Sequence, residues 1–316
     1  MRILVTNDDG VDSAGLHALA RALVAAGRDV VVVAPDGEMS GSGAAIGHIH
    51  ADASIDALPV ELPGLDGVPA YAVAGPPGLC VLAARLGGFG DPPDMVVSGI
   101  NPGCNTGRAV LHSGTVGAAL TAANFGVRGL AVSIDVVSGL LHEQGPRQVT
   151  PVAEGEQAVV EVVEAPDQGP NGHAPDGHAP DGDGGPAPKR GAPAHWDTAA
   201  EVAAAAVDWL LAAPKGTVLN LNVPDLPWDR LAGARPATLA PFGSVRSTVI
   251  ESAEDGGKLQ MDLRPTATAD LPPDCDTALV AAGFVAVSAI TGVRIDPDVD
   301  VTAVLHDIGA FARGAP

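Results

Sequence analysis

Residues 2–10 read RILVTNDDG, an apolar run that ends in two adjacent aspartates and a glycine. The run at 2–6 predicts a short buried strand, and Gly10 permits a tight turn directly after it. Leucines at helical spacing follow, then Gly27, and then a second apolar strand at 29–35 with the sequence DVVVVAP. Two buried strands joined by a helix are typical of the start of a parallel α/β sheet.

The alternation of strands and helices continues along most of the chain, which predicts a doubly wound α/β fold. Further strands are predicted at 70–74, 95–97, 130–134 and 218–223, and further helices at 79–86, 116–125 and 197–213. In such sheets a ligand binds beyond the carboxyl ends of the strands, near the point where the strand order reverses. Candidate functional residues are therefore sought at those ends.

Two segments depart from this pattern. Residues 148–194 are rich in Gly, Pro, Asp and His, carry a short GHAPD repeat and lack core-forming periodicity. We predict a low-complexity, disordered insertion there. From 235 the chain is β-like and interrupted by Gly and Pro, which predicts an appended arm over 235–316. The catalytic core is then expected to comprise 1–147 and 195–234.

The composition limits the classes of partner. With 17 basic and 38 acidic residues the formal charge is −21, which disfavours nucleic acid polymers and anionic membranes. Three widely spaced cysteines suit a reducing cytosol, and the N-terminus has no signal-peptide pattern, so we expect a cytoplasmic protein. The uncharged stretch 277–293 is shorter than a membrane span and is interpreted as a short helix running into a buried strand.

The acidic pair Asp8 and Asp9 is the main candidate for chemistry. Adjacent carboxylates at the end of a strand repel each other unless they share a cation. The alternative is that one of them caps the next helix, but Asp12 and Ser13 are better placed for that role. We therefore expect a metal site at Asp8 and Asp9.

Loops after other strands offer oxygen atoms that could complete this site. Ser40 or Ser42 lies in the second loop and Asn101 in the fourth, and we favour Ser40 with Asn101. Oxygen ligands without His or Cys select Mg²⁺ or Mn²⁺ rather than zinc.

A phosphate site is expected at the start of the helix after His112. Ser113, Gly114 and Thr115 open this helix, and a helix N-terminus offers free N–H groups to an anion. A serine or threonine at this position is equally typical of an ordinary helix cap.

Seven stretches of the chain resemble the SurE family of survival proteins, which act as 5′-nucleotidases. They are ILVTNDDG at 3–10, VVAPDGEMSGSG at 32–43, VVSGINPGCNTG at 96–107, HSGTVGAA at 112–119, HWDTAA at 195–200, LNLNVPDLP at 219–227 and DCDTALVAAGFVAVS at 274–288. The resemblance covers nearly the whole chain apart from 148–194.

The resemblance implies a Rossmann-like core with an extended C-terminal β arm that exchanges between subunits, in a homodimer or tetramer. It implies one divalent cation per subunit, held by Asp8, Asp9, Ser40 and Asn101. Asn105 in the same loop as Asn101, together with Ser113, Gly114 and Thr115, is expected to bind the substrate. The implied reaction is hydrolysis of nucleoside 5′-monophosphates, with 3′-monophosphates and short polyphosphate as further substrates, and Asp8 and Asp9 are the expected catalytic residues.

Some positions depart from the family pattern. His112 stands where the family usually has Tyr, and the turn at 75–78 reads GPPG, without the family's threonine. Two rival functions use similar features. A receiver-type Mg²⁺-binding signalling module would need an acceptor aspartate after the third strand and a lysine after the fifth, and the chain has no lysine before Lys189. A nucleoside N-glycoside hydrolase would need more carboxylates than Asp8, Asp9 and Asp12.

Overall fold

The structure, a computed structural model, describes residues 1–47, 54–136, 194–241, 245–251, 260–265 and 271–293. They belong to one compact unit, which takes in 1–138 and 194–316. The insertion predicted at 148–194 lies outside the described residues, apart from Ala194. Within the described ranges, the helices are all too short or too polar to cross a membrane.

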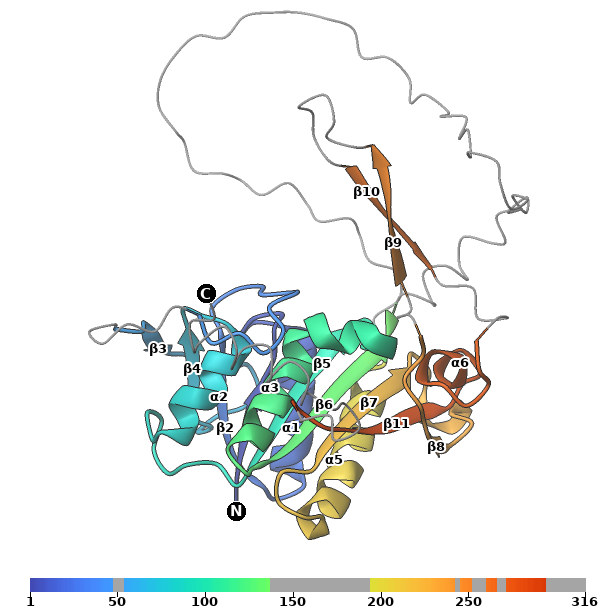
Figure 1. The fold of residues 1–316 in the computed structure, drawn as a ribbon. Coiled ribbons are helices and arrows are strands. Elements are labelled where there is room, and N and C mark those ends of the chain that lie inside the picture. Colours follow the sequence, from blue (N-terminus) through green and yellow to red (C-terminus); the bar gives the residue numbers. More distant parts are fainter. Residues whose placement is uncertain (48–53, 137–193, 242–244, 252–259, 266–270, 294–316) are drawn as a thin grey trace, which may run out of the picture. The chain divides into compact units, whose positions relative to one another are not determined.

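A nine-stranded sheet runs through the unit in the order β3-β4-β2-β1-β5-β6-β7-β11-β8 (Figure 1). The run from β4 to β7 is parallel, as predicted from the apolar strands. The strands are β1 Arg2–Thr6, β2 Asp29–Pro35, β3 Ala57–Pro59, β4 Ala70–Val73, β5 Met95–Pro102, β6 Arg128–Asp135, β7 Val218–Pro224, β8 Ala234–Pro236 and β11 Val285–Ile290. The helices are α1 Ala14–Ala25, α2 Pro77–Arg85, α3 Gly114–Asn124, α5 Trp196–Ala212 and α6 Asp276–Ala281, with 3₁₀ turns η1 Gly107–His112 and η2 Trp228–Arg230.

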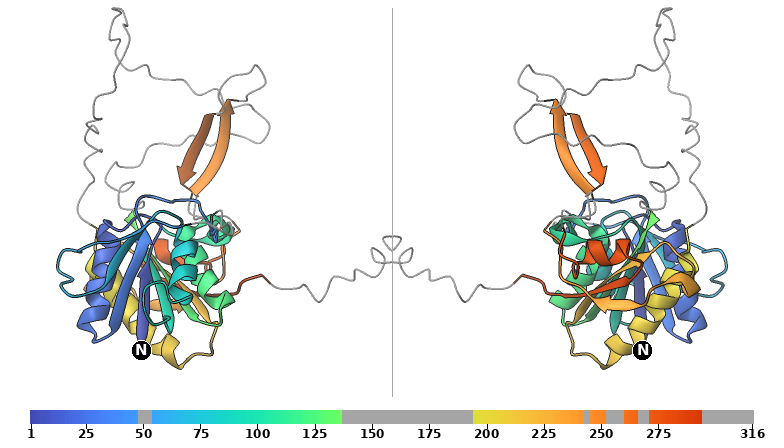
Figure 2. Two further views of the ribbon diagram at one scale, coloured as in Figure 1. Left: turned by 90° about the vertical axis from the view of Figure 1, so that its left-hand side faces the viewer. Right: turned by 90° about the vertical axis from the view of Figure 1, so that its right-hand side faces the viewer.

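Helices cover both faces of the sheet (Figure 2). Side chains alternate along each strand, so Ile3 and Val5 join the apolar cluster under α1 and α5. Leu4, between them, joins the cluster under α2 and α3. All three side chains are fully buried, which explains why the sequence of β1 is apolar without a break.

The strand order reverses between β1 and β5. From β1 the chain proceeds outward through β2 and β4, and it then returns to β5 on the other side of β1. Thr6 pairs with Ser98 at this junction, so the residues after β1 and those in the second half of β5 lie at the same edge of the sheet. This edge is where a ligand is expected in a doubly wound fold.

The region after 235 has two parts with different structures. Strands β9 (Val245–Glu251) and β10 (Gln260–Pro265) form a separate antiparallel pair. Strand β11 instead returns to the main sheet and pairs antiparallel with β7. It covers an edge that β7 would otherwise leave open, so the main sheet extends past the boundary predicted at 235. The helix-then-strand interpretation of 277–293 is confirmed by α6 and β11.

Candidate active site

The acidic loop after β1 is held by the side chain of Asn7. This residue is fully buried, and its amide nitrogen donates to the Gly10 carbonyl (3.0 Å) and to Ser13 Oγ (2.7 Å). Ser13 Oγ in turn accepts from the Leu16 amide and caps α1. Ser13, one of the two candidates for the cap, is therefore the cap, and neither Asp8 nor Asp9 is used for it.

Asp8 is a buried carboxylate, 4% exposed. Its Oδ1 accepts a hydrogen bond of 2.5 Å from the Thr115 hydroxyl. Burial raises the pKa of Asp8, while the Thr115 hydroxyl and the backbone amides of Thr115 and Gly114 partly offset this rise. The carboxylate thus lies at the N-terminus of α3, where the helix dipole favours a negative charge.

The start of α3 packs directly onto Asp8. A Cβ added at Gly114 would lie 2.7 Å from Asp8 Cβ, 2.8 Å from Asp8 Oδ2 and 2.6 Å from Ser42 Oγ. Only glycine therefore fits between these groups. Ser113 Oγ accepts from the Val116 amide at 3.1 Å, so this serine is the cap of α3.

These contacts refine the predicted phosphate site. The hydroxyls of Ser113 and Thr115 both make hydrogen bonds within the protein, to the Val116 amide and to Asp8. The amides of Gly114 and Thr115 act on Asp8. Phosphate binding by these residues remains a prediction. A phosphate bound there would lie beside the Asp8 carboxylate.

The second loop, after β2, lies against both Asp8 and α3. The Met39 amide donates to the Asp8 carbonyl at 2.7 Å, and the Gly43 amide donates to the His112 carbonyl at 3.2 Å. Ser40 is exposed, and its hydroxyl donates to Glu38 at 3.0 Å. Ser42, two residues on, has a buried Oγ that makes no hydrogen bond to any described residue.

Asn101 lies in the last part of β5, opposite Ser133 of β6. Its amide nitrogen donates to the Gly103 carbonyl at 2.7 Å. Because the nitrogen is used in this way, the side-chain oxygen is the atom that can serve as a ligand. The structure places Asn101 at the predicted edge of the sheet, on the strand that pairs with β1, after which Asp8 follows.

Asn105 is fixed by residues that the sequence did not single out. Its backbone amide donates to Asn222 Oδ1 at 2.8 Å, and its side-chain nitrogen donates to Ser133 Oγ at 2.9 Å. Its carbonyl accepts from the side chains of Asn220 and Asn222 at 2.9 and 3.0 Å. Both asparagines are fully buried in β7, so the candidate substrate loop is anchored to the sheet.

A second anchor is the buried carboxylate of Asp276 at the start of α6. Its Oδ2 accepts from the Gly107 amide at 2.8 Å, and its Oδ1 accepts from the Ala240 and Thr277 amides at 3.0 and 2.8 Å. Burial raises the pKa of Asp276, and these backbone hydrogen bonds act in the opposite direction. The loop 105–107 is therefore held from two distant parts of the chain.

The model of the family described as survival protein SurE matches residues 3–244. This chain belongs to the SurE family. It is 31% identical over 298 residues to the 5′-nucleotidase SurE of Stenotrophomonas maltophilia strain K279a, a match that spans 94% of this chain and 90% of the relative. It is 29% identical over 324 residues to the 5′-nucleotidase SurE of Aeromonas hydrophila, with 98% of each chain covered.

The fold agrees with the solved structure of the SurE protein from Aquifex aeolicus. The TM-score is 0.64 at 22% identity, with 98% of this chain and 100% of the other covered. The Rossmann-like fold predicted from the sequence is thereby confirmed.

Within the described residues, no three His, Cys, Asp or Glu side chains are grouped so that they could hold a metal ion. The site of oxygen ligands expected at Asp8, Asp9, Ser40 and Asn101 has two carboxylates and two neutral side chains, and it stays a prediction.

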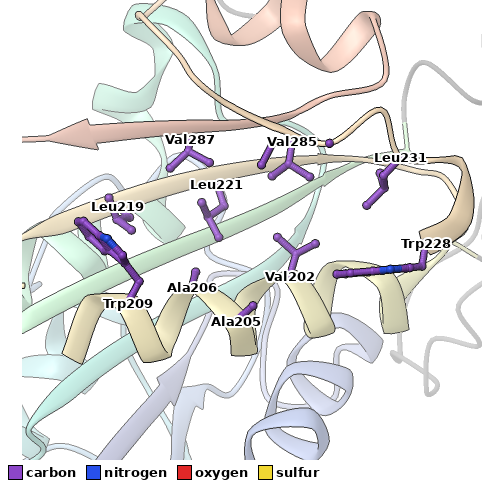
Figure 3. A pocket seen from close by; sticks show the side chains of 12 residues that line it. Val202, Ala205, Ala206, Trp209, Leu219, Leu221, Trp228, Leu231, Val285 and Val287 are labelled. Carbon is purple, nitrogen blue, oxygen red and sulfur yellow. The ribbon is translucent and has the colours of Figure 1, made fainter. Parts of the chain in front are cut away.

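A large apolar pocket lies away from these residues, between α5 and the strands β7 and β11 (Figure 3). Its volume is about 580 Å³. It is lined by Val202, Ala205, Ala206, Trp209, Leu219, Leu221, Trp228, Leu231, Gly233, Ala234, Val285 and Val287. None of these side chains is titratable, so the pocket does not carry the chemistry predicted for the site.

Proposed function

We propose that this protein is a divalent-metal-dependent 5′-nucleotidase, which hydrolyses nucleoside 5′-monophosphates to nucleoside and phosphate. The observation that carries the proposal is the buried carboxylate of Asp8, fixed by Thr115 at the N-terminus of α3 in a family whose relatives are named 5′-nucleotidases. Activity on 3′-monophosphates and short polyphosphate, and assembly as a homodimer or tetramer, belong to the same proposal.

The residues present suit a hard divalent cation. The causes that shift the pKa of Asp8 are burial and hydrogen bonds, with no contribution from a cationic side chain of the described residues. A desolvated carboxylate without a cationic neighbour is stabilised by a bound metal ion. Asp8, Asp9, Ser40 and Asn101 would hold Mg²⁺ or Mn²⁺ through oxygen atoms. Such an ion, when bound, polarises phosphoryl oxygens and lowers the pKa of an attacking water.

Side chains and backbone amides of the protein orient the Asp8 carboxylate and stabilise its negative charge. Thr115 holds Asp8 in one orientation, and the amides at the start of α3 stabilise its negative charge. Asn105, fixed by Asn222 and Ser133, presents a rigid loop to the substrate. Ser113, Gly114 and Thr115 would line the place where negative charge develops in the transition state. Both aspartates remain assigned as catalytic.

The proposal is tested by assaying the release of inorganic phosphate from a panel of 5′- and 3′-nucleoside monophosphates. Activity should disappear after exhaustive treatment with EDTA, because the chelator removes the cation. It should return with Mg²⁺ or Mn²⁺, because these are the ions that a site made of oxygen ligands selects. Undiminished turnover after chelation would contradict the metal assignment.

The same panel separates the proposal from its rivals. A nucleoside N-glycoside hydrolase would release free base instead of phosphate. A receiver-type module would release neither at a catalytic rate. The family match disfavours both, since it spans residues 3–244 and the relatives are named as nucleotidases.

A further inference from the structure

The hydroxyl of Ser42 is a polar group that the predicted site does not use. Its Oγ is buried and makes no hydrogen bond to any described residue. Buried polar atoms without a partner are uncommon in native proteins, and each one needs an explanation. A ligand that accepts a hydrogen bond at this position would provide one.

Ser42 Oγ lies beside the catalytic candidates. A Cβ atom added at Gly114 would lie 2.6 Å from Ser42 Oγ and 2.8 Å from Asp8 Oδ2, so both oxygens border the same point. The absence of a side chain at Gly114 therefore brings the hydroxyl, the carboxylate and the start of α3 together. The positive end of the helix dipole at this position favours an anionic ligand.

The backbone of Ser42 is firmly held although its hydroxyl is not. Its amide donates to the Met39 carbonyl at 3.2 Å, and its carbonyl accepts from the Ala45 amide at 3.1 Å. Met39 is itself hydrogen-bonded to the Asp8 carbonyl. The turn therefore sets the position of Ser42 relative to Asp8 without using the side-chain oxygen.

The other hydroxyls in these loops already have partners. Ser40 donates to Glu38, Thr115 donates to Asp8, and Ser113 Oγ caps α3. Ser113 Oγ is the acceptor in its cap. Of these four side chains, Ser42 is the one whose oxygen lies in the space beside Asp8 without any hydrogen bond to a described residue. Ser40, which the sequence favoured for a metal ligand, is exposed instead.

We propose that Ser42 Oγ donates a hydrogen bond to a phosphoryl oxygen of the bound nucleotide. This assignment rests on the proposed function and gives it a specific phosphate-binding residue. Ser42 acts as a donor to the anion and is not a ligand of the cation. Its contribution should therefore appear in phosphate affinity and leave metal affinity unchanged.

The test is to measure the binding of inorganic phosphate by calorimetry to the full-length, Mn²⁺-loaded protein. In Ser42→Ala the affinity for phosphate should fall about tenfold, the size expected for a hydrogen bond to a charged group. Ser42→Thr retains the hydroxyl and should bind phosphate nearly as well as the wild type. Ser54→Ala, the same chemical change at an exposed serine, is the matched control and should have no effect.

A separate titration of the metal-free proteins with Mn²⁺ distinguishes the two possible roles of the hydroxyl. Ser42→Ala should bind Mn²⁺ as the wild type does, and a parallel loss of Mn²⁺ affinity would show that the hydroxyl serves the cation. Unchanged phosphate affinity in Ser42→Ala would also overturn the assignment. If the alanine variant does not fold, Ser42→Cys replaces it, because the thiol has a similar shape and is a weaker donor.

Failure of this assignment is distinguishable from failure of the proposed function. A wild-type protein that releases phosphate from nucleotides, with a Ser42→Ala variant that binds phosphate equally well, would refute only the role of Ser42. A wild-type protein that releases no phosphate from any nucleotide would refute both.

Discussion

The surroundings of Asp8 and the pocket beneath α5 belong to the same sheet but are built in opposite ways. Around Asp8 the protein is closely packed, and there is no room for even a methyl group at Gly114. Beneath α5 there is a cavity of about 580 Å³, lined by apolar side chains and bordered by the exposed Trp209 and Trp228 (Figure 3). The region around Asp8 has polar groups but no cavity, whereas the region beneath α5 has a cavity lined by apolar side chains.

The groups predicted to carry the chemistry therefore lie outside the large cavity. Polar groups converge at the edge where strands end, because the loops after β1, β2 and β5 meet there. The pocket lies over a face of the sheet, where alternate side chains of β7 and β11 are apolar. Three of the four variants below test whether the two regions are functionally separate, and the fourth tests the Asp276 anchor of the loop at 105–107.

The largest effect is expected from Asp9→Asn. Removal of one of the two carboxylates should lower kcat/KM by about 10³-fold or more, since the loss of a metal ligand removes several kcal/mol of transition-state stabilisation. The fold should be retained, and the metal-free protein should melt no lower than the wild type, because repulsion from Asp8 is relieved. Activity assays at saturating Mn²⁺ and thermal melting check this. Near-normal turnover would refute the assignment of the pair.

A smaller but still large loss of activity is expected from Gly114→Ala. The added methyl group would lie within 2.8 Å of Asp8 and Ser42, so both must move. A displacement of this kind at a catalytic site can cost about 10²-fold in rate. Gly37→Ala is the matched control, because a Cβ at Gly37 meets no atom within 4 Å. If both variants retained wild-type kcat/KM, close packing around Asp8 would not matter for catalysis.

Asp276→Asn should lower stability by about 1–3 kcal/mol. Both side-chain oxygens of the aspartate, ionised or protonated, can accept from the backbone amides that face them, whereas the NH2 group of asparagine cannot. The effect should depend on pH. Burial raises the pKa of Asp276 above its ordinary value of 3.8, so the stability that this group contributes is fully present below that value. It is lost as pH rises through the folded-state pKa. The penalty of the substitution should thus be largest in acid and shrink toward neutral pH.

Urea unfolding of wild type and Asp276→Asn across a pH series measures this trend. A penalty that grows as pH rises would show that the carboxylate is stabilised rather than destabilised by its surroundings.

The smallest effect is expected from Trp209→Ala at the border of the pocket. This side chain is 60% exposed, so its loss should change stability by only about 0.5 kcal/mol. Because the pocket lacks catalytic groups, kcat/KM should stay within about twofold of the wild type. A tenfold loss of activity without loss of stability would mean that the two regions are coupled.

The sequence predicted those elements whose apolar runs are continuous. For β1 and β2 the predicted bounds agree with the structure, because strands buried on both faces admit few polar residues. Strand β5 was predicted over 95–97 but extends to Pro102. Its second half contains Gly, Asn and Pro, which indicate a turn by local propensity, whereas pairing with β6 keeps it extended.

For the candidate site, local patterns singled out Asp8 and the start of α3, and they gave Asp12 and Ser13 as candidates for the cap of α1. They did not reveal that Thr115 donates to Asp8, or that Asn220, Asn222 and Asp276 hold the loop at 105–107. Such contacts join residues more than 100 positions apart and leave no periodic signal. One indication was available at 219–223, which read LNLNV. There, asparagines alternate with apolar residues in a strand whose other side chains indicate burial in the core.

The hydrogen bonds of the loop at 105–107 also set an order of events during synthesis of the chain. The Gly107 amide donates to Asp276, which is 169 positions later in the sequence, and the Asn105 amide donates to Asn222, which is 117 positions later. While the N-terminal half emerges from the ribosome, the two aspartates are already present, but the acceptors for this loop have not been translated. A chain terminated before α6 would carry the acidic pair, but its loop at 105–107 would lack the hydrogen bond to Asp276. The hydrogen bonds of this loop can therefore be completed only after α6 has been translated, close to the end of the described chain.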